Sequence, residues 1–286
     1  PALVVSQPAR PAGRGRGERE PAVARRAREL GLAVAQPQGA RDPRLLDELR
    51  SIAPDWAIVV AYGEIFRAEL LGLPRRGWLN VHASLLPRWR GAAPIQAAIA
   101  AGEPQTGVTI MEIEEGLDSG PLVLQRELAI GPDEQAPELA ARLARLGGEV
   151  LVEALAGLDS GQLVPRPQDP AAATYAPRLT RADGRVDWRL PAARLYDRWR
   201  AFQPWPGLHA ELTGEPVKLV RVRPAEPATA AAEPGTIVAV DENGIQVGCG
   251  SGSNLLLEEL QRPGRRVVAG AEFARGDRIT LGQRFA

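Results

Sequence analysis

Continuous apolar runs alternate with helical patterns through the first half of this sequence, and no other feature constrains the fold as strongly. Apolar residues recur at helical spacing in residues 21–30 and 42–53. Residues 56–61 (WAIVVA) are then apolar throughout, which is typical of a strand covered on both faces. Two more strand-like runs follow, at 78–83 and 106–113. We therefore predict a Rossmann-like α/β domain with an open, mostly parallel sheet.

The pattern changes after a long amphipathic helix predicted at residues 138–158, so that residues 1–160 form the first domain. Residues 161–177 hold several prolines, which helix and sheet interiors exclude, and we predict a linker there. Residues 178–286 contain one helical segment and then short alternating stretches. They predict a small OB-like β-barrel, with strands at 217–222, 235–240, 244–249, 254–260 and 277–281.

Composition narrows the class of protein only a little. The 286 residues include 35 Lys or Arg and 35 Asp or Glu, so the net charge indicates no partner. Cys249 is the single cysteine and cannot form an intramolecular disulfide, and no Cys/His cluster has zinc spacing. No apolar run approaches the ~18 residues of a membrane helix. We expect a monomeric, cytoplasmic protein without a metal.

Three polar side chains of chemically useful types lie in one region of the predicted sheet. Asn80 and His82 stand two apart in the strand-like LNVHAS, so their side chains point to the same face. We expect them beyond the C-terminal end of the strand, where open α/β sheets bind ligands. Asp118 follows in GLDSG, where two glycines favour a sharp turn that presents the carboxylate.

An amide, an imidazole and a carboxylate suit acyl transfer to an amine without a covalent enzyme intermediate. The carbonyl oxygen becomes negative as the amine attacks, and hydrogen bonds from Asn80 and His82 can stabilise it, each such donor being worth about 3–4 kcal/mol. Asp118 can orient the imidazole or assist proton transfer from the amine. An N-x-H pair alone is more often structural, and an Asp in such a turn more often shapes the turn. The three together favour catalysis.

Residues 79–120 closely resemble the methionyl-tRNA branch of the formyltransferase family. The N-x-H pair, the SLLP segment and the later Asp are shared across that family, and RWRGAAPIQ at 88–96 is similar to this branch. The similarity extends to QPARPAGRGR at 7–16, AYG at 61–63, RAFQPWPG at 200–207 and the C-terminal barrel. It covers essentially the whole chain.

The resemblance implies transfer of the formyl group of 10-formyltetrahydrofolate to the α-amine of methionyl initiator tRNA, a step of translation initiation. Asn80, His82 and Asp118 match the family's catalytic trio. The residues that match its folate-contacting segment are Ser84, Leu85, Leu86 and Pro87, and Tyr62 and Gly63 either line the same pocket or pack in the core. Arg14 matches a loop arginine implicated in tRNA recognition, and Arg16 is expected to contact phosphate beside it. The barrel resembles the family's tRNA-binding domain.

Two departures from the family pattern are visible. Family members begin with a strand, a G-T-P turn and a helix, and that strand lies in the middle of the sheet. These parts are absent here, so we expect upstream sequence to be missing. Ala9 also stands where the family's QPDRPAG pattern has Asp.

Two other functions remain open at this point. The chain could be a folate-dependent formyltransferase whose acceptor is an amino-sugar nucleotide or the amine of a purine precursor. The RWRGAAPIQ segment and the barrel argue against that acceptor. The chain could also be an RNA-binding fragment without catalysis.

Overall fold

The computed structural model describes residues 1–12, 17–64, 66–226 and 232–286. These residues form two compact units. The first comprises Pro1–Arg90, Val108–Arg126 and Gly147–Ala173, and the second comprises Gly91–Gly107, Glu127–Leu146 and Thr174–Ala286. No helix in the described parts of the chain is long and apolar enough to cross a membrane.

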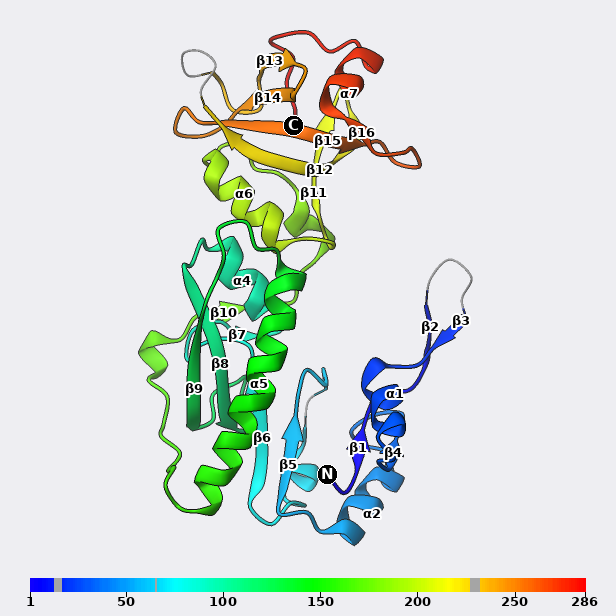
Figure 1. Ribbon diagram of the computed structural model, residues 1–286, viewed down its shortest axis with the longest axis vertical. Helices are drawn as coiled ribbons and strands as arrows, with labels where there is room; N and C mark the ends of the chain where they lie inside the picture. Colours follow the sequence, from blue (N-terminus) through cyan, green and yellow to red (C-terminus); the bar gives the residue numbers. More distant parts are fainter. Residues whose placement is uncertain (13–16, 65, 227–231) are drawn as a thin grey trace. The chain divides into compact units, whose positions relative to one another are not determined.

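The first half of the chain forms a four-stranded sheet with the strand order β5-β6-β8-β9 (Figure 1). The strands are Trp56–Val59, Gly77–His82, Gln105–Glu112 and Leu122–Ala129. β6 is parallel to β5 and antiparallel to β8. The α/β class with an open, Rossmann-like sheet is confirmed, and β8 adds an antiparallel pairing to it. The chain between β6 and β8 holds the short strand β7 (Arg90–Gly91) and the seven-residue helix α4 (Pro94–Ala100), and it brings β8 back antiparallel to β6.

Two further parallel strands form a separate sheet. β1 (Val4–Val5) pairs with β4 (Val34–Ala35), and the hairpin β2–β3 and helix α1 come between them in the chain, at Arg10–Ala12, Gly17–Arg19 and Ala22–Glu29. Val5 of β1 and Val59 of β5 nevertheless pack against one apolar cluster, which includes Leu45, Leu46, Leu49, Leu70 and Trp78. Thus β1 and β5 share a core, although in the described residues they belong to different sheets and each pairs with only one strand.

The helices of this region follow the local signals in the sequence. α2 (Pro43–Ile52) begins after Asp42, whose side chain accepts a hydrogen bond from the Arg44 amide, and it ends at Ala53 in the left-handed conformation. α3 is short (Ala68–Leu71), and α5 is long (Ala136–Asp159). A Cβ at Gly147 of α5 would lie 2.9 Å from Val81 Cγ1, so glycine allows the helix to approach β6 closely.

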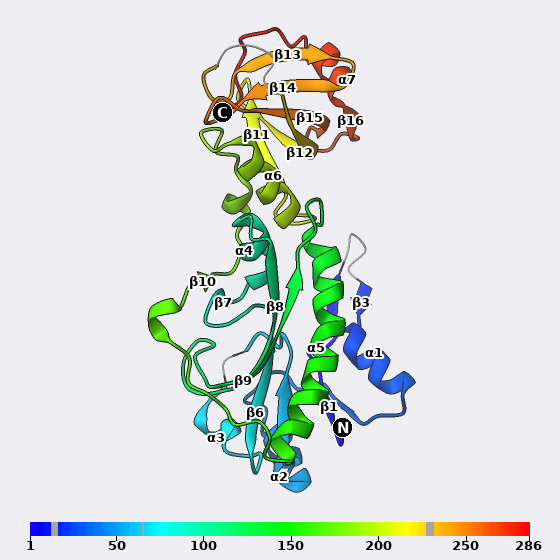
Figure 2. The same cartoon turned by 60° about the vertical axis from the view of Figure 1, so that its left-hand side comes forward.

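The second unit contains an antiparallel sheet in the order β11-β12-β15-β14-β13, with β16 added to β15 (Figure 2). These strands are Leu208–Leu212, Glu215–Ala225, Asn254–Gln261, Gly244–Gly248, Ile237–Asp241 and Val268–Ala269. The chain's last residues pair near both edge strands of this sheet: Phe285 pairs with Leu212 of β11, and Arg284 pairs with Thr236 beside β13. The tail thus connects the edges, as in the predicted barrel-like arrangement.

Four shorter helical elements and a small strand complete the second half of the chain: α6 (Ala192–Ala201), α7 (Gly270–Gly276), the 3-10 turns Pro170–Ala172 and Arg181–Gly184, and β10 (Tyr175–Ala176), which pairs with β7. The predicted strand at 277–281 is wrong. The Asp277 and Ile279 amides close the end of α7 by donating to Phe273 and Ala274, and Arg278 is left-handed, with φ 51°. The chain therefore turns after α7 and does not continue as an extended strand.

Candidate active site

The structure brings together the three side chains that the sequence analysis selected. Asn80 and His82 lie at the end of β6, where the register pairs them with Met111 and Thr109 of β8. The Asp118 carboxylate faces both: Oδ1 is 3.5 Å from Asn80 Nδ2, and Oδ2 is 3.7 Å from His82 Nδ1. An amide, an imidazole and a carboxylate therefore converge at one end of the strand.

The turn that carries Asp118 has the unusual backbone that its sequence suggests. Asp118 is left-handed, with φ 48°, and Gly116 has φ 129°. A Cβ at Gly120 would lie 2.0 Å from the carbonyl oxygen of Glu112, so only glycine fits there. Close approach of the backbone therefore requires glycine at the end of GLDSG, just before β9.

A backbone carbonyl determines how the His82 ring can be protonated. His82 is buried, and its Nε2 lies 3.0 Å from the carbonyl oxygen of Trp89. A carbonyl can only accept, so Nε2 carries the hydrogen in this contact. Nδ1 then carries a hydrogen only in the charged ring, and it is Nδ1 that faces Asp118. Sequence patterns did not identify Trp89, because the contact uses its main chain.

Hydrogen bonds from two side chains of the neighbouring strands β8 and β9 hold the SLLP segment in place. Thr109 of β8, which has no exposed area, donates from Oγ1 to the Ser84 carbonyl (2.6 Å) and accepts from the Leu86 amide (3.1 Å). Gln125 of β9 donates to the Leu86 carbonyl (2.8 Å) and to Thr109 Oγ1 (2.9 Å). Thr109 and Gln125 belong to no recognisable sequence motif, so no local pattern pointed to them.

The predicted folate-contacting residues fall into two groups. The Ser84 side chain is fully buried and donates to the Arg88 carbonyl (2.6 Å), and Leu86 is 3% exposed. These two side chains face the protein. Leu85 and Pro87 are half-buried and reach the surface of the segment.

Tyr62 and Gly63 follow β5 and begin the loop that leads to Glu64. Tyr62 is half-buried, and burial, reinforced by the Glu64 carboxylate, raises the pKa of its hydroxyl. Gly63 has φ 78°, which favours glycine. Arg14 and Arg16, the predicted tRNA contacts, lie outside the described residues.

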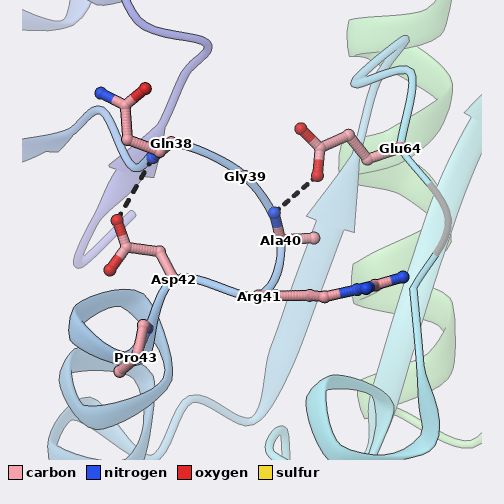
Figure 3. A pocket seen from close by; sticks show the side chains of 7 residues that line it. All are labelled: Gln38, Gly39, Ala40, Arg41, Asp42, Pro43 and Glu64. Atoms are coloured by element: carbon pink, nitrogen blue, oxygen red, sulfur yellow. Dashed lines mark hydrogen bonds between the residues drawn. The ribbon is translucent and has the colours of Figure 1, made fainter.

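A hollow of about 750 Å³ lies beside this loop (Figure 3). Its walls are Glu64 and the segment that leads into α2, namely Gln38, Gly39, Ala40, Arg41, Asp42 and Pro43. The Glu64 carboxylate accepts a hydrogen bond from the Ala40 amide (2.6 Å), and the Asp42 carboxylate accepts one from the Gln38 amide (3.2 Å). These bonds hold the segment in place, and none of the three converging side chains lines the hollow.

No metal site accompanies the three side chains in the described part of the chain, where no group of three or more His, Cys, Asp or Glu side chains could hold an ion.

Comparison with known proteins identifies the class. The model of the formyl transferase family matches residues 1–155, and the model of the formyl transferase C-terminal domain matches residues 178–278. A protein of Anaeromyxobacter dehalogenans is 52% identical over 96% of this chain and 88% of its own length. A protein of Myxococcus xanthus is 46% identical over 98% of this chain and 88% of its own length. Both are named methionyl-tRNA formyltransferase. The chain therefore belongs to the formyltransferase family, and within it to the branch of the methionyl-tRNA formyltransferases.

Solved structures show the same fold at low sequence identity. HypX from Aquifex aeolicus, crystallised with tetrahydrofolic acid, superposes with a TM-score of 0.61 at 20% identity, over 87% of this chain and 43% of the HypX chain. An N-formyltransferase from Helicobacter canadensis, in complex with folinic acid and dTDP-3-aminofucose, gives a TM-score of 0.62 at 16% identity, over 81% of this chain and 80% of its own.

Proposed function

We propose that this chain transfers the formyl group of 10-formyltetrahydrofolate to the α-amine of methionine on initiator tRNA, and that it acts in translation initiation. The observation that carries the catalytic part is the convergence of Asn80, His82 and Asp118 at the end of β6. Family membership supports formyl transfer, and the name shared by relatives that are 44–52% identical supports the acceptor.

The reaction requires stabilisation of a growing negative charge. The amine nitrogen forms a bond to the formyl carbon, the bond from that carbon to folate N10 breaks, and one proton passes from the amine to N10. Asn80 Nδ2 has two hydrogens, of which one faces Asp118 and the second can donate to the formyl oxygen. His82 Nδ1 can donate to the same oxygen when the ring is charged. Two donors aimed at one oxygen form an oxyanion site.

Asp118 has two tasks in this proposal. Its carboxylate, 3.7 Å from His82 Nδ1, orients the ring from that side. It can also accept the proton that the attacking amine loses, directly or through water. Because Trp89 holds Nε2, the ring cannot turn away while Nδ1 donates.

The folate is expected to lie against the segment 84–87. Leu85 and Pro87 supply accessible apolar surface, whereas Ser84 and Leu86 shape the segment from inside. Tyr62 and Gly63 would form a second wall after β5. In this arrangement the polar network of Thr109 determines where the segment presents its surface.

The second unit supplies arginines for an anionic acceptor. Arg262, Arg265 and Arg266 line a hollow of about 570 Å³ between β15 and α7, and Arg265 and Arg266 are exposed. Asp277 and Glu272 line the same hollow and pair with Arg262 and Arg266. Guanidinium groups at a surface suit contacts with the phosphates of RNA, which would make binding salt-dependent. Arg14 and Arg16 are proposed to add contacts with the tRNA.

The acceptor is tested by measuring formylation of three amines with the same protein and 10-formyltetrahydrofolate. We expect product with methionyl initiator tRNA and none with a dTDP-amino sugar or the amine of a purine precursor. Activity on a small amine only would overturn the choice of acceptor. Binding of tRNA without formylation of any amine would favour the RNA-binding alternative.

Replacing the trio tests the catalytic roles. His82→Ala removes one donor to the oxyanion, and we expect kcat to fall by about 10²–10³-fold. Asp118→Ala should have an effect of similar size, while tRNA affinity changes by less than about twofold. Single-turnover formylation and filter binding measure the two quantities. The matched control is His209→Ala, which changes the chain's other histidine. A near-normal rate in either trio variant would refute the assigned role.

A further inference from the structure

Gln168 lies in the segment predicted as a linker, yet its side-chain amide makes four hydrogen bonds inside the first unit. Its Oε1 accepts from Nε and Nη2 of Arg90, at 3.1 and 2.7 Å. Its Nε2 donates to the carbonyl oxygens of Asp118 and Gly120, both at 2.8 Å. Both amide hydrogens are therefore used to hold the backbone of the turn that carries the Asp118 carboxylate.

This turn needs external support. Asp118 is left-handed and Gly116 has a positive φ, so the backbone adopts conformations that an ordinary chain segment rarely occupies. Such conformations persist when the surroundings hold them. The position of the carboxylate follows directly from the backbone of its own residue, and so Gln168 acts on it through the two carbonyl groups.

Arg90 determines which way the Gln168 amide points. A guanidinium has only donors, so the amide must turn its oxygen toward Arg90 and its nitrogen toward the turn. Arg90 is 7% exposed, which keeps water from competing for the contact. The segment around Gln168 is also anchored, because Arg166 exchanges two backbone hydrogen bonds with Leu122 of β9, at 2.7 and 2.9 Å.

Residues 89 and 90 thereby connect the two halves of the site. The Trp89 carbonyl holds the His82 ring, and the next side chain, Arg90, orients the amide that holds the Asp118 turn. One short stretch of chain thus sets the positions of both His82 and Asp118. Their separation decides whether the carboxylate can face Nδ1.

We infer that Gln168 is a positioning residue for the Asp118 carboxylate and that Arg90 orients the Gln168 amide. The inference rests on the proposed function, because it concerns the same site. Gln168 touches no reacting atom. Its effect is to keep the Asp118 turn in the one arrangement in which the carboxylate faces both Asn80 and His82.

Gln168→Glu isolates the two donor bonds. The carboxylate keeps the shape of the side chain and still accepts from Arg90, but it cannot donate to the two carbonyls. We expect kcat for methionyl-tRNA to fall about tenfold or more, because a small displacement of a catalytic group is costly. The KM for each substrate should change by less than about threefold. Gln168→Met, a neutral side chain of similar size, should give the same split between kcat and KM.

The matched control is Gln162→Glu, an identical change in the same segment at an exposed side chain. A second measurement, which is independent of activity, is hydrogen exchange of the peptide that spans residues 116–121. Exchange in this peptide should rise about tenfold in Gln168→Glu and stay unchanged in Gln162→Glu.

The two readouts separate this inference from the proposed function. A wild-type chain that formylates no methionyl-tRNA contradicts the proposed function, while faster exchange of 116–121 in Gln168→Glu still supports the positioning role. Unchanged exchange, or a kcat within about twofold of the Gln162→Glu value, would overturn the positioning role. A similar loss in kcat and in thermal stability for both variants would do the same, because it would show a general structural effect.

Discussion

His82 is placed between two oxygen atoms of different kinds. The Trp89 carbonyl at Nε2 is neutral and only accepts, and the Asp118 carboxylate near Nδ1 is an anion. Trp89 itself is left-handed, with φ 62°, and this costly conformation directs its carbonyl at the ring. In the proposed reaction, the ring would use Nε2 for its own placement and Nδ1 for the substrate.

Cys249 illustrates how burial removes reactivity from a single residue. The thiol is 2% exposed beside β14 and lies 3.4 Å from the Val247 carbonyl, and burial raises its pKa to about 12. At about pH 8 only about one thiol in 10⁴ is then ionised. We expect no reaction of the native protein with a thiol reagent in the time that the urea-unfolded chain needs to react fully. Rapid labelling of the native protein would contradict the buried position.

The SLLP segment shows at the scale of elements how a loop is held by the sheet below it. Thr109 contributes one hydroxyl that serves the Ser84 carbonyl, the Leu86 amide and the Gln125 amide. The loop therefore depends on β8 and β9 for these polar contacts, which hold its apolar surface in a single arrangement.

Thr109→Val tests this dependence. Valine has the same shape but leaves two buried groups, the Ser84 carbonyl and the Leu86 amide, without this partner, and it removes one acceptor of the half-buried Gln125 amide. We expect the free energy of unfolding to fall by about 1–3 kcal/mol. The KM for the folate should rise as the segment loosens. Thr106→Val is the matched control on the same strand, because Thr106 Oγ1 is buried without a hydrogen-bond partner, so that losing it should be neutral or stabilising. Urea titrations compare the variants, and equal losses at both positions would contradict the network.

At the scale of the whole molecule, the parallel strands of the first unit form two sheets. In the described residues β6 pairs on both sides, with β5 and β8, whereas β5 pairs only with β6 and β1 only with β4. The runs around β1 and β5 are as apolar as a central strand, yet the residues of both strands are only partly buried. The side chains of these strands are therefore more apolar than their partial burial in the structure requires.

Hydrogen exchange should reveal this difference. The β5 amides that point away from β6 have no strand partner, so we expect peptides that cover Trp56–Val59 to exchange about tenfold faster than those that cover Gly77–His82. Mass spectrometry of a timed exchange series gives the comparison, with β15 as a doubly paired reference in the second unit. Equal protection of β5 and β6 would show that the free edge of β5 is covered in solution.

Much of the fold and of the site could be predicted because the signals are local. The same-face placement of Asn80 and His82 follows from the two-residue repeat of a strand. The start and end of α2 follow from Asp42 and the residues around it, and the Asp118 turn follows from its flanking glycines. The family motif then connected these pieces to formyl transfer.

Local sequence patterns therefore account for the three polar side chains that converge at β6 and for the order of the main helices and strands, since each depends on neighbours a few residues away. The tertiary structure alone decided that β8 runs antiparallel to β6, that the Trp89 carbonyl holds His82, and that Gln168 supports the Asp118 turn. The Gln168 contacts join residues 50 and 78 positions apart. The physical reason is that such contacts depend on where distant main-chain carbonyl groups point after the chain has packed, and no local pattern of side chains specifies that direction.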